Sequence, residues 1–123
     1  MQVSEFSIFR TLLNDVHHKA FGEPLSALPH GKAQALSWFI EETTGQVLSY
    51  KTLSNFVGAA LQRRPESINP NASTLAILVR YLQGQAAGAD TVVWYKYRSR
   101  FFGQEGGAKG TYPMSAVGAM LGA

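Results

Sequence analysis

Three amphipathic helical patterns follow one another between Leu36 and Leu82, separated only by short breaks. In each pattern apolar residues recur every three or four positions, which is the spacing of one buried helix face. Helices joined by short loops pack against each other as neighbours. The region therefore predicts a compact helical bundle, and no internal repeat interrupts it.

Turn and capping residues set the ends of the predicted helices. A serine precedes the pattern that begins near residue 49, and an asparagine precedes the pattern that begins near residue 72. In these positions their side chains accept hydrogen bonds from the first turn of a helix. Gly22 and Pro24 end the predicted helix of residues 4–20, and Gly45 ends the predicted helix of residues 32–44. The predicted helices cover residues 4–20, 32–44 and 49–61, with Ser49 as the N-cap of the third, and a fourth begins after Asn71.

The character of the chain changes after Gly84. Thr91 to Phe102 reads TVVWYKYRSRFF, in which β-branched and aromatic residues alternate with polar ones. This composition favours a strand, and a helical extension is the competing interpretation. We therefore expect a mainly α-helical fold: a four-helix domain over 1–84, a linker and aromatic, basic segment over 85–102, and a loosely held glycine-rich tail over 103–123.

Composition limits the setting in which the chain works. It has no cysteine, no apolar run close to the ~20 residues that span a bilayer, and no signal-peptide core, which together predict a soluble cytoplasmic protein. The net charge of +3 is unevenly distributed, because acids exceed bases over residues 1–42 whereas bases exceed acids over 43–104. This polarity fits a face that meets a polyanion, and it also fits ordinary solubilising charge.

The stretch NPNASTLAILVRYL, from Asn69 on, resembles the segment after the recognition helix in lambda-repressor-like (Cro/C1-type) DNA-binding domains. The residues that carry the resemblance are Pro70, Thr74, Leu75, Leu78 and Leu82 here, with Leu36, Ile40, Gly45, Ser49, Leu53 and Phe56 upstream. The resemblance covers about residues 32–83. It departs from the family in the turn between Thr44 and Ser49, which is about two residues longer than the usual tight turn.

This resemblance implies a helix-turn-helix whose third helix enters the DNA major groove. Asn55 would read adenine, and Lys51 would reach guanine or a phosphate. The remaining candidates would hold phosphate oxygens or act as clamps on the DNA backbone. The complete set of predicted nucleic-acid contacts is Lys32, Ser49, Tyr50, Lys51, Thr52, Ser54, Asn55, Arg63 and Arg64. The alternative is that Ser49 is only a cap, that Tyr50 covers the core, and that Lys51 and Asn55 are solvated side chains.

Aromatic and cationic residues interleave in the segment that follows the bundle. They favour a dimer or partner contact, with stacking on single-stranded nucleic acid or plain packing on the bundle as alternatives. The predicted contact residues are Trp94, Tyr95, Tyr97, Arg98, Arg100 and Phe101.

No pattern of residues predicts catalysis. His17 and His18 are adjacent on a helix and project about 100° apart, so they do not face one metal ion, and no nucleophile elbow or phosphate-cradling motif occurs. We therefore expect a protein that is not an enzyme, without cofactor, metal or small-molecule substrate. The predicted function is binding of double-stranded DNA, as a dimeric transcription regulator or architectural protein. The alternative is a protein–protein interaction module that docks through the aromatic segment and the apolar tail.

Overall fold

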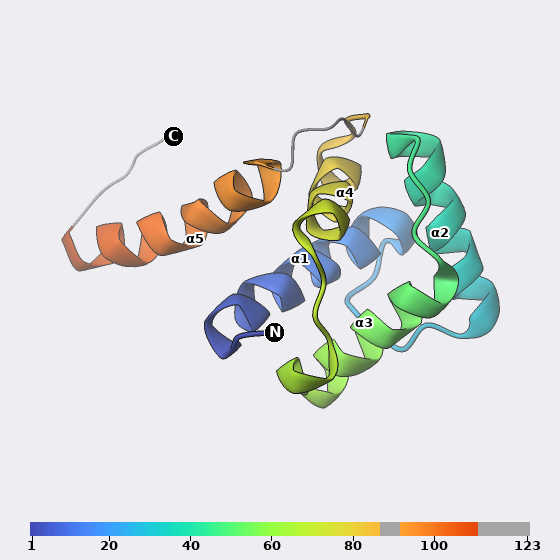
Figure 1. Cartoon of the computed structure of the whole chain (residues 1–123), viewed down its shortest axis with the longest axis horizontal. Helices are drawn as coiled ribbons and strands as arrows, with labels where there is room; N and C mark the ends of the chain where they lie inside the picture. The colour runs from blue at the N-terminus through green and yellow to red at the C-terminus, as the bar shows by residue number, and fades with distance from the viewer. Residues whose placement is uncertain (87–91, 111–123) are drawn as a thin grey trace.

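The computed structural model describes residues 1–86 and 92–110, and beyond Phe101 it describes only the path of the backbone. These residues form five α-helices and one 3-10 turn, with no strand among them. The helices are α1 (Val3–Phe21), α2 (His30–Thr44), α3 (Tyr50–Gln62), α4 (Ala72–Gln83) and α5 (Val92–Gly110), and the turn η1 (Pro65–Ser67) lies between α3 and α4 (Figure 1).

The four helices predicted from residue spacing are confirmed, and local hydrogen bonds explain their ends. Ser49 Oγ accepts the Thr52 N–H at 3.1 Å, and Asn71 Oδ1 accepts the Thr74 N–H at 2.8 Å, so both predicted N-caps are formed. Gly45 ends α2 in the left-handed conformation, with φ at 78°, as its sequence position predicts.

The end of α3 is less usual, because it places an arginine in the left-handed region. Arg63 has a φ of 56°, and it is the only residue other than glycine with positive φ in the described part of the chain. The Arg64 N–H donates to the Ala59 carbonyl at 2.9 Å, which satisfies one of the last free carbonyls of the helix. Pro65 follows at once and prevents the helix from continuing.

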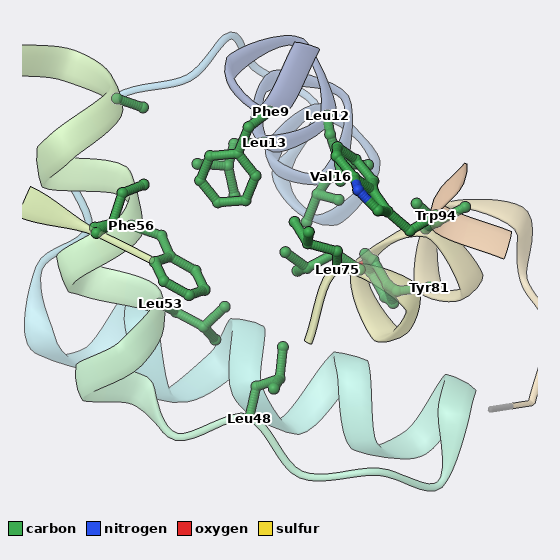
Figure 2. Close-up of a cluster of buried hydrophobic side chains, with 14 of the residues drawn as sticks. Phe9, Leu12, Leu13, Val16, Leu48, Leu53, Phe56, Leu75, Tyr81 and Trp94 are labelled. Carbon is green, nitrogen blue, oxygen red and sulfur yellow. The ribbon is translucent and has the colours of Figure 1, made fainter. Parts of the chain in front are cut away.

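One core holds the helices together. α1 packs against α3, α4 and α5, and α2 packs against α3 and α4. Figure 2 shows labelled side chains of α1, α3, α4 and α5, together with Leu48 from the segment before α3, converging in this core. Phe9 and Phe56 meet edge to face, with their ring centroids 5.3 Å apart, and tie α1 to α3.

The strand predicted for Thr91 to Phe102 is wrong, and the competing helical extension is confirmed. From Val92 on, the segment belongs to α5, which continues beyond residue 102 to Gly110. As a helix it places Trp94, Tyr97 and Phe101 on one side, three and four residues apart, where Trp94 and Tyr97 are buried. Burial of two large aromatic side chains outweighs the local preference of valine and tyrosine for strands. The rest of the predicted tail, residues 111–123, lies outside the described residues.

Candidate nucleic-acid interface

The outer face of α3 is polar and open to solvent. Leu53, Phe56 and Val57 are buried on the inner face, so the opposite side of the helix presents Lys51 and Asn55, which are both exposed. Ser54 lies beside them and is partly exposed. The structure thus brings three of the predicted contact residues together on one accessible surface.

The N-termini of α2 and α3 lie side by side. The connection of residues 45–49 runs back along α2, and Ser37 Oγ of α2 donates a hydrogen bond to the Leu48 carbonyl at 2.5 Å. The first residues of the two helices then meet, since the rings of His30 and Tyr50 are 4.7 Å apart and nearly perpendicular. Because the connection returns along α2, α3 begins beside the start of α2, as Figure 1 shows.

This arrangement concentrates positive partial charge at one end of the α2–α3 pair. The first backbone N–H groups of a helix have no partner within the helix, and the helix dipole adds positive potential there. At α3 the Ser49 side chain caps only the Thr52 N–H, and at α2 the Pro29 N-cap contributes no side-chain hydrogen bond. The side chain of Lys51 adds a full positive charge close to the same end.

Two predicted phosphate contacts are already engaged in the cap of α3. Ser49 Oγ accepts the Thr52 N–H and also lies 3.0 Å from Thr52 Oγ1, to which it donates. A hydroxyl that serves as a cap is less available to an outside ligand, and Thr52 is half-buried. Tyr50 is also half-buried, against His30.

Lys32 is held within the chain as well. Its Nζ lies 2.5 Å from Glu23 Oε1 and 4.7 Å from the centroid of the Phe21 ring. The hydrogen bond and the charge of Lys32 lower the pKa of the Glu23 carboxyl. The structure therefore gives Lys32 an intramolecular role that links the loop after α1 to the start of α2.

The two arginines at the C-terminal end of α3 are exposed. Within the described part of the chain, Lys51, Arg63 and Arg64 form no ion pair with a carboxylate. Because a charge without a partner keeps its full attraction for an external ion, these three cations are available to attract a polyanion.

A shallow, open groove of about 410 Å³ lies along this face. Its lining is mostly polar and comes from α3, Arg64 and η1: Ser54, Asn55, Gly58, Ala59, Gln62, Arg64 and Ser67. Sequence reasoning missed Gly58, Gln62, Ser67 and Ala59. The first two lie three and seven residues after Asn55 and share its helix face, so extending the outer stripe of α3 finds them. Ser67 reaches the groove only because η1 folds back after α3, and no sequence signal marks it.

The aromatic and basic residues of α5 divide into three groups. Trp94 and Tyr97 are buried inside the chain at 2% and 6% exposure, and burial is the main cause that raises the pKa of Tyr97 to about 12. Arg98 forms an ion pair with Glu5 and also lies 5.5 Å from the centroid of the Tyr95 ring, while Phe101 packs on Tyr97.

The third group, Tyr95 and Arg100, faces solvent together with Lys96. A partner that approached α5 would meet these residues and not the stacked pair of Trp94 and Tyr97.

No family model, curated protein or solved structure matches the chain. None of the described helices has the length and apolar character needed to cross a membrane. In the same residues, no three histidine, aspartate or glutamate side chains come together in a way that would hold a metal ion. The described residues thus form a helical bundle in which α3 presents an open, polar face with cations at its two ends.

Proposed function

We propose that the protein binds double-stranded DNA through the outer face of α3, with the N-termini of α2 and α3 turned toward the phosphates. The observation that carries the proposal is the combination on α3 of an exposed polar face with cations that have no carboxylate partner in the described residues. A rigid, capped helix of this kind fits the major groove, where an exposed asparagine and lysine can reach base edges.

Each proposed contact has a distinct part. Asn55 reads adenine, and Lys51 contacts guanine or a phosphate. Arg63 and Arg64 neutralise phosphates at the far end of the helix and supply affinity that falls with salt. The intramolecular contacts of Ser49, Thr52 and Lys32 leave these three residues the supporting part of fixing both helix starts. The protein acts as a regulator of transcription or as an architectural factor, and two copies read two half-sites.

The decisive experiment is fluorescence anisotropy with random-sequence duplex DNA between about 50 and 200 mM salt, the range in which phosphate contacts are evident. Wild-type protein should bind with an affinity that falls steeply as salt rises. In Arg63→Gln/Arg64→Gln the slope of log K against log salt should become shallower by about 2, since each phosphate contact contributes about 0.9. Lys51→Ala/Asn55→Ala should weaken binding at every salt concentration.

α5 offers a control matched in charge. Lys96 and Arg100 are also exposed cations, but α5 packs on α1 and α4, whereas α3 packs on α1 and α2. Lys96→Gln/Arg100→Gln removes the same charge as the double arginine variant and should leave duplex affinity and its salt slope close to wild type. Absence of duplex binding by wild-type protein at low salt would reject the proposal. Binding lost only in the α5 variant would assign the contact to α5 instead.

Fewer residues support the alternative, a protein–protein interaction module, than the sequence predicted. Trp94 and Tyr97 are buried in the chain's own core, and the apolar tail lies outside the described residues. An α5 contact would therefore depend on Tyr95, Lys96 and Arg100. It would show little salt dependence if the exposed ring of Tyr95 dominated it.

A further inference from the structure

The groove on α3 has a glycine in its wall. Gly58 lies between Asn55 and Gln62 on the outer side of the helix, with Ser54 and Ala59 beside it. Arg64 and Ser67 close the end of the groove beyond the helix, where Ser67 Oγ donates to the Arg64 carbonyl at 2.8 Å. The seven lining residues include a cation and no carboxylate.

Nothing inside the described fold requires a glycine at position 58. Its backbone is helical and φ is not positive, so any L-amino acid except proline adopts the same conformation. A Cβ built on Gly58 meets no atom within 4 Å, so no neighbouring element approaches too closely for alanine. Glycine is the poorest helix former apart from proline, because it loses the most backbone freedom on folding. The position therefore carries a residue that weakens α3 without helping it to pack.

A glycine that the fold does not need is explained when something outside the fold approaches the backbone closely. We propose that the sugar–phosphate backbone of bound DNA lies in this groove across Gly58, with one phosphate at the Arg64 guanidinium. The inference rests on the function proposed above and deepens it, since it names the part of DNA that this segment of α3 contacts.

The chemistry of the lining favours a nucleic-acid backbone as the occupant. Arg64 supplies a charged fork for phosphate oxygens, and Ser54, Asn55 and Gln62 offer neutral hydrogen-bond donors along the same path. Asn55 lines the groove and also faces the proposed base contacts, so a strand that crosses Gly58 continues the same interface. A missing side chain allows the bulky sugar to come closer to the helix axis than a stripe of longer side chains permits.

Substitutions of Gly58 should have opposite effects on protein stability and on DNA affinity. Gly58→Ala should raise Tm by about 4 °C, because alanine is the better helix former and nothing obstructs its methyl group. The same variant should weaken duplex binding about tenfold at 100 mM salt, the size of one lost contact to a charged phosphate. Gly58→Leu fills more of the groove and should weaken binding further, without adding a hydrogen-bonding group.

Ser7 supplies matched controls, because it is exposed on α1 in a helical position away from the groove. Ser7→Ala and Ser7→Leu introduce the same alanine and leucine side chains on α1. Both variants should leave duplex affinity unchanged. A more stable Gly58→Ala that binds more weakly than both wild type and Ser7→Ala supports the inference. Wild-type binding that persists unchanged in both Gly58 variants would overturn the inference and leave the DNA-binding function standing. Wild-type protein that does not bind duplex DNA would remove both.

Discussion

α3 and α5 both combine apolar or aromatic side chains with cations in the helix or at its end, but the bundle uses the two helices differently. In α3 the side chains of Leu53, Phe56 and Val57 are buried, whereas Lys51 is exposed, as is Arg64 just after the helix, and neither has a carboxylate partner in the described residues. In α5 two aromatic side chains anchor the helix, and Arg98 pairs with Glu5 of α1.

The difference separates cations that stabilise the fold through intramolecular contacts from cations that are available to bind an external anion. Arg98 lies across the junction between α5 and α1, and its guanidinium also rests over the Tyr95 ring. The cations of α3 have no such internal function among the described residues. Sequence composition alone assigns equal weight to both groups, whereas the contacts assign them different tasks. The predictions below test that assignment.

The largest effect should come from removing the aromatic anchor of α5. Trp94 is only 2% exposed and packs into the core, so Trp94→Ala leaves a large cavity and should cost about 3–5 kcal/mol of unfolding free energy. Urea unfolding followed by far-UV circular dichroism measures this loss. The half-exposed Tyr95, changed to alanine, is the control from the same helix and should change stability by only about 0.5 kcal/mol.

Substitutions on the exposed face of α3 should show the opposite result, a loss of DNA affinity without a loss of stability. Lys51→Ala/Asn55→Ala, on the exposed face of α3, should keep the wild-type unfolding free energy and lose affinity. If Trp94→Ala cost less than about 1 kcal/mol, α5 would not be anchored through its aromatic side and the contrast between the two helices would fail.

The helices of the bundle could be predicted from the sequence because their signals are local. Ser49 and Asn71 cap their helices through backbone groups three residues away, and the buried positions Leu53, Phe56 and Val57 follow helical spacing. α5 could not be predicted in this way. Its residues satisfy the spacing of a strand and of a helix at once, and the decision lies in α1 and α4, which bury Trp94 and Tyr97.

The candidate site divides along the same line. The exposure of Lys51 and Asn55 follows from the helix pattern, and so does the shared face of Gly58. The ion pair between Lys32 and Glu23 joins residues on either side of a loop whose path the sequence does not specify. The return of residues 45–49 along α2 is likewise a tertiary result, because it depends on Leu48 entering the core and on the hydrogen bond to Ser37.

Alkaline pH should reveal the burial of Tyr97. Its pKa rises from the ordinary value of 10.0 to about 12, chiefly because burial disfavours the phenolate, with the charge of Asp15 adding to the rise and Arg100 opposing it. Between pH 10 and 12 the unfolded chain loses this proton before the folded protein does, so stability falls by at most about 1.4 kcal/mol per pH unit. Below pH 10 the contribution of Tyr97 is fully present.

Tyr97→Phe removes the titrating hydroxyl and should reduce that alkaline loss, measured as the difference in urea midpoint between pH 9 and pH 11.5. Tyr95→Phe, on the exposed side of α5, is the matched variant and should keep the wild-type difference. Equal losses in wild type and Tyr97→Phe would mean that the Tyr97 hydroxyl is solvated in solution.

The smallest effect, and the most direct test of the comparison, concerns single cations. The side chains of Arg98 and Glu5 are 32% and 24% exposed, so their ion pair is only partly shielded from water and should contribute about 0.5–1 kcal/mol. A double-mutant cycle with Arg98→Gln and Glu5→Gln isolates that coupling from the other contacts of Arg98. Arg64→Gln, just after the end of α3, removes the same charge and should leave stability unchanged within about 0.5 kcal/mol. Duplex affinity should show the opposite order of effects: Arg64→Gln should weaken binding, and Arg98→Gln should leave it unchanged. A stability cost for Arg64→Gln as large as that for Arg98→Gln would show that α3 uses its cations internally, and the case for an external polyanion would lose its main support.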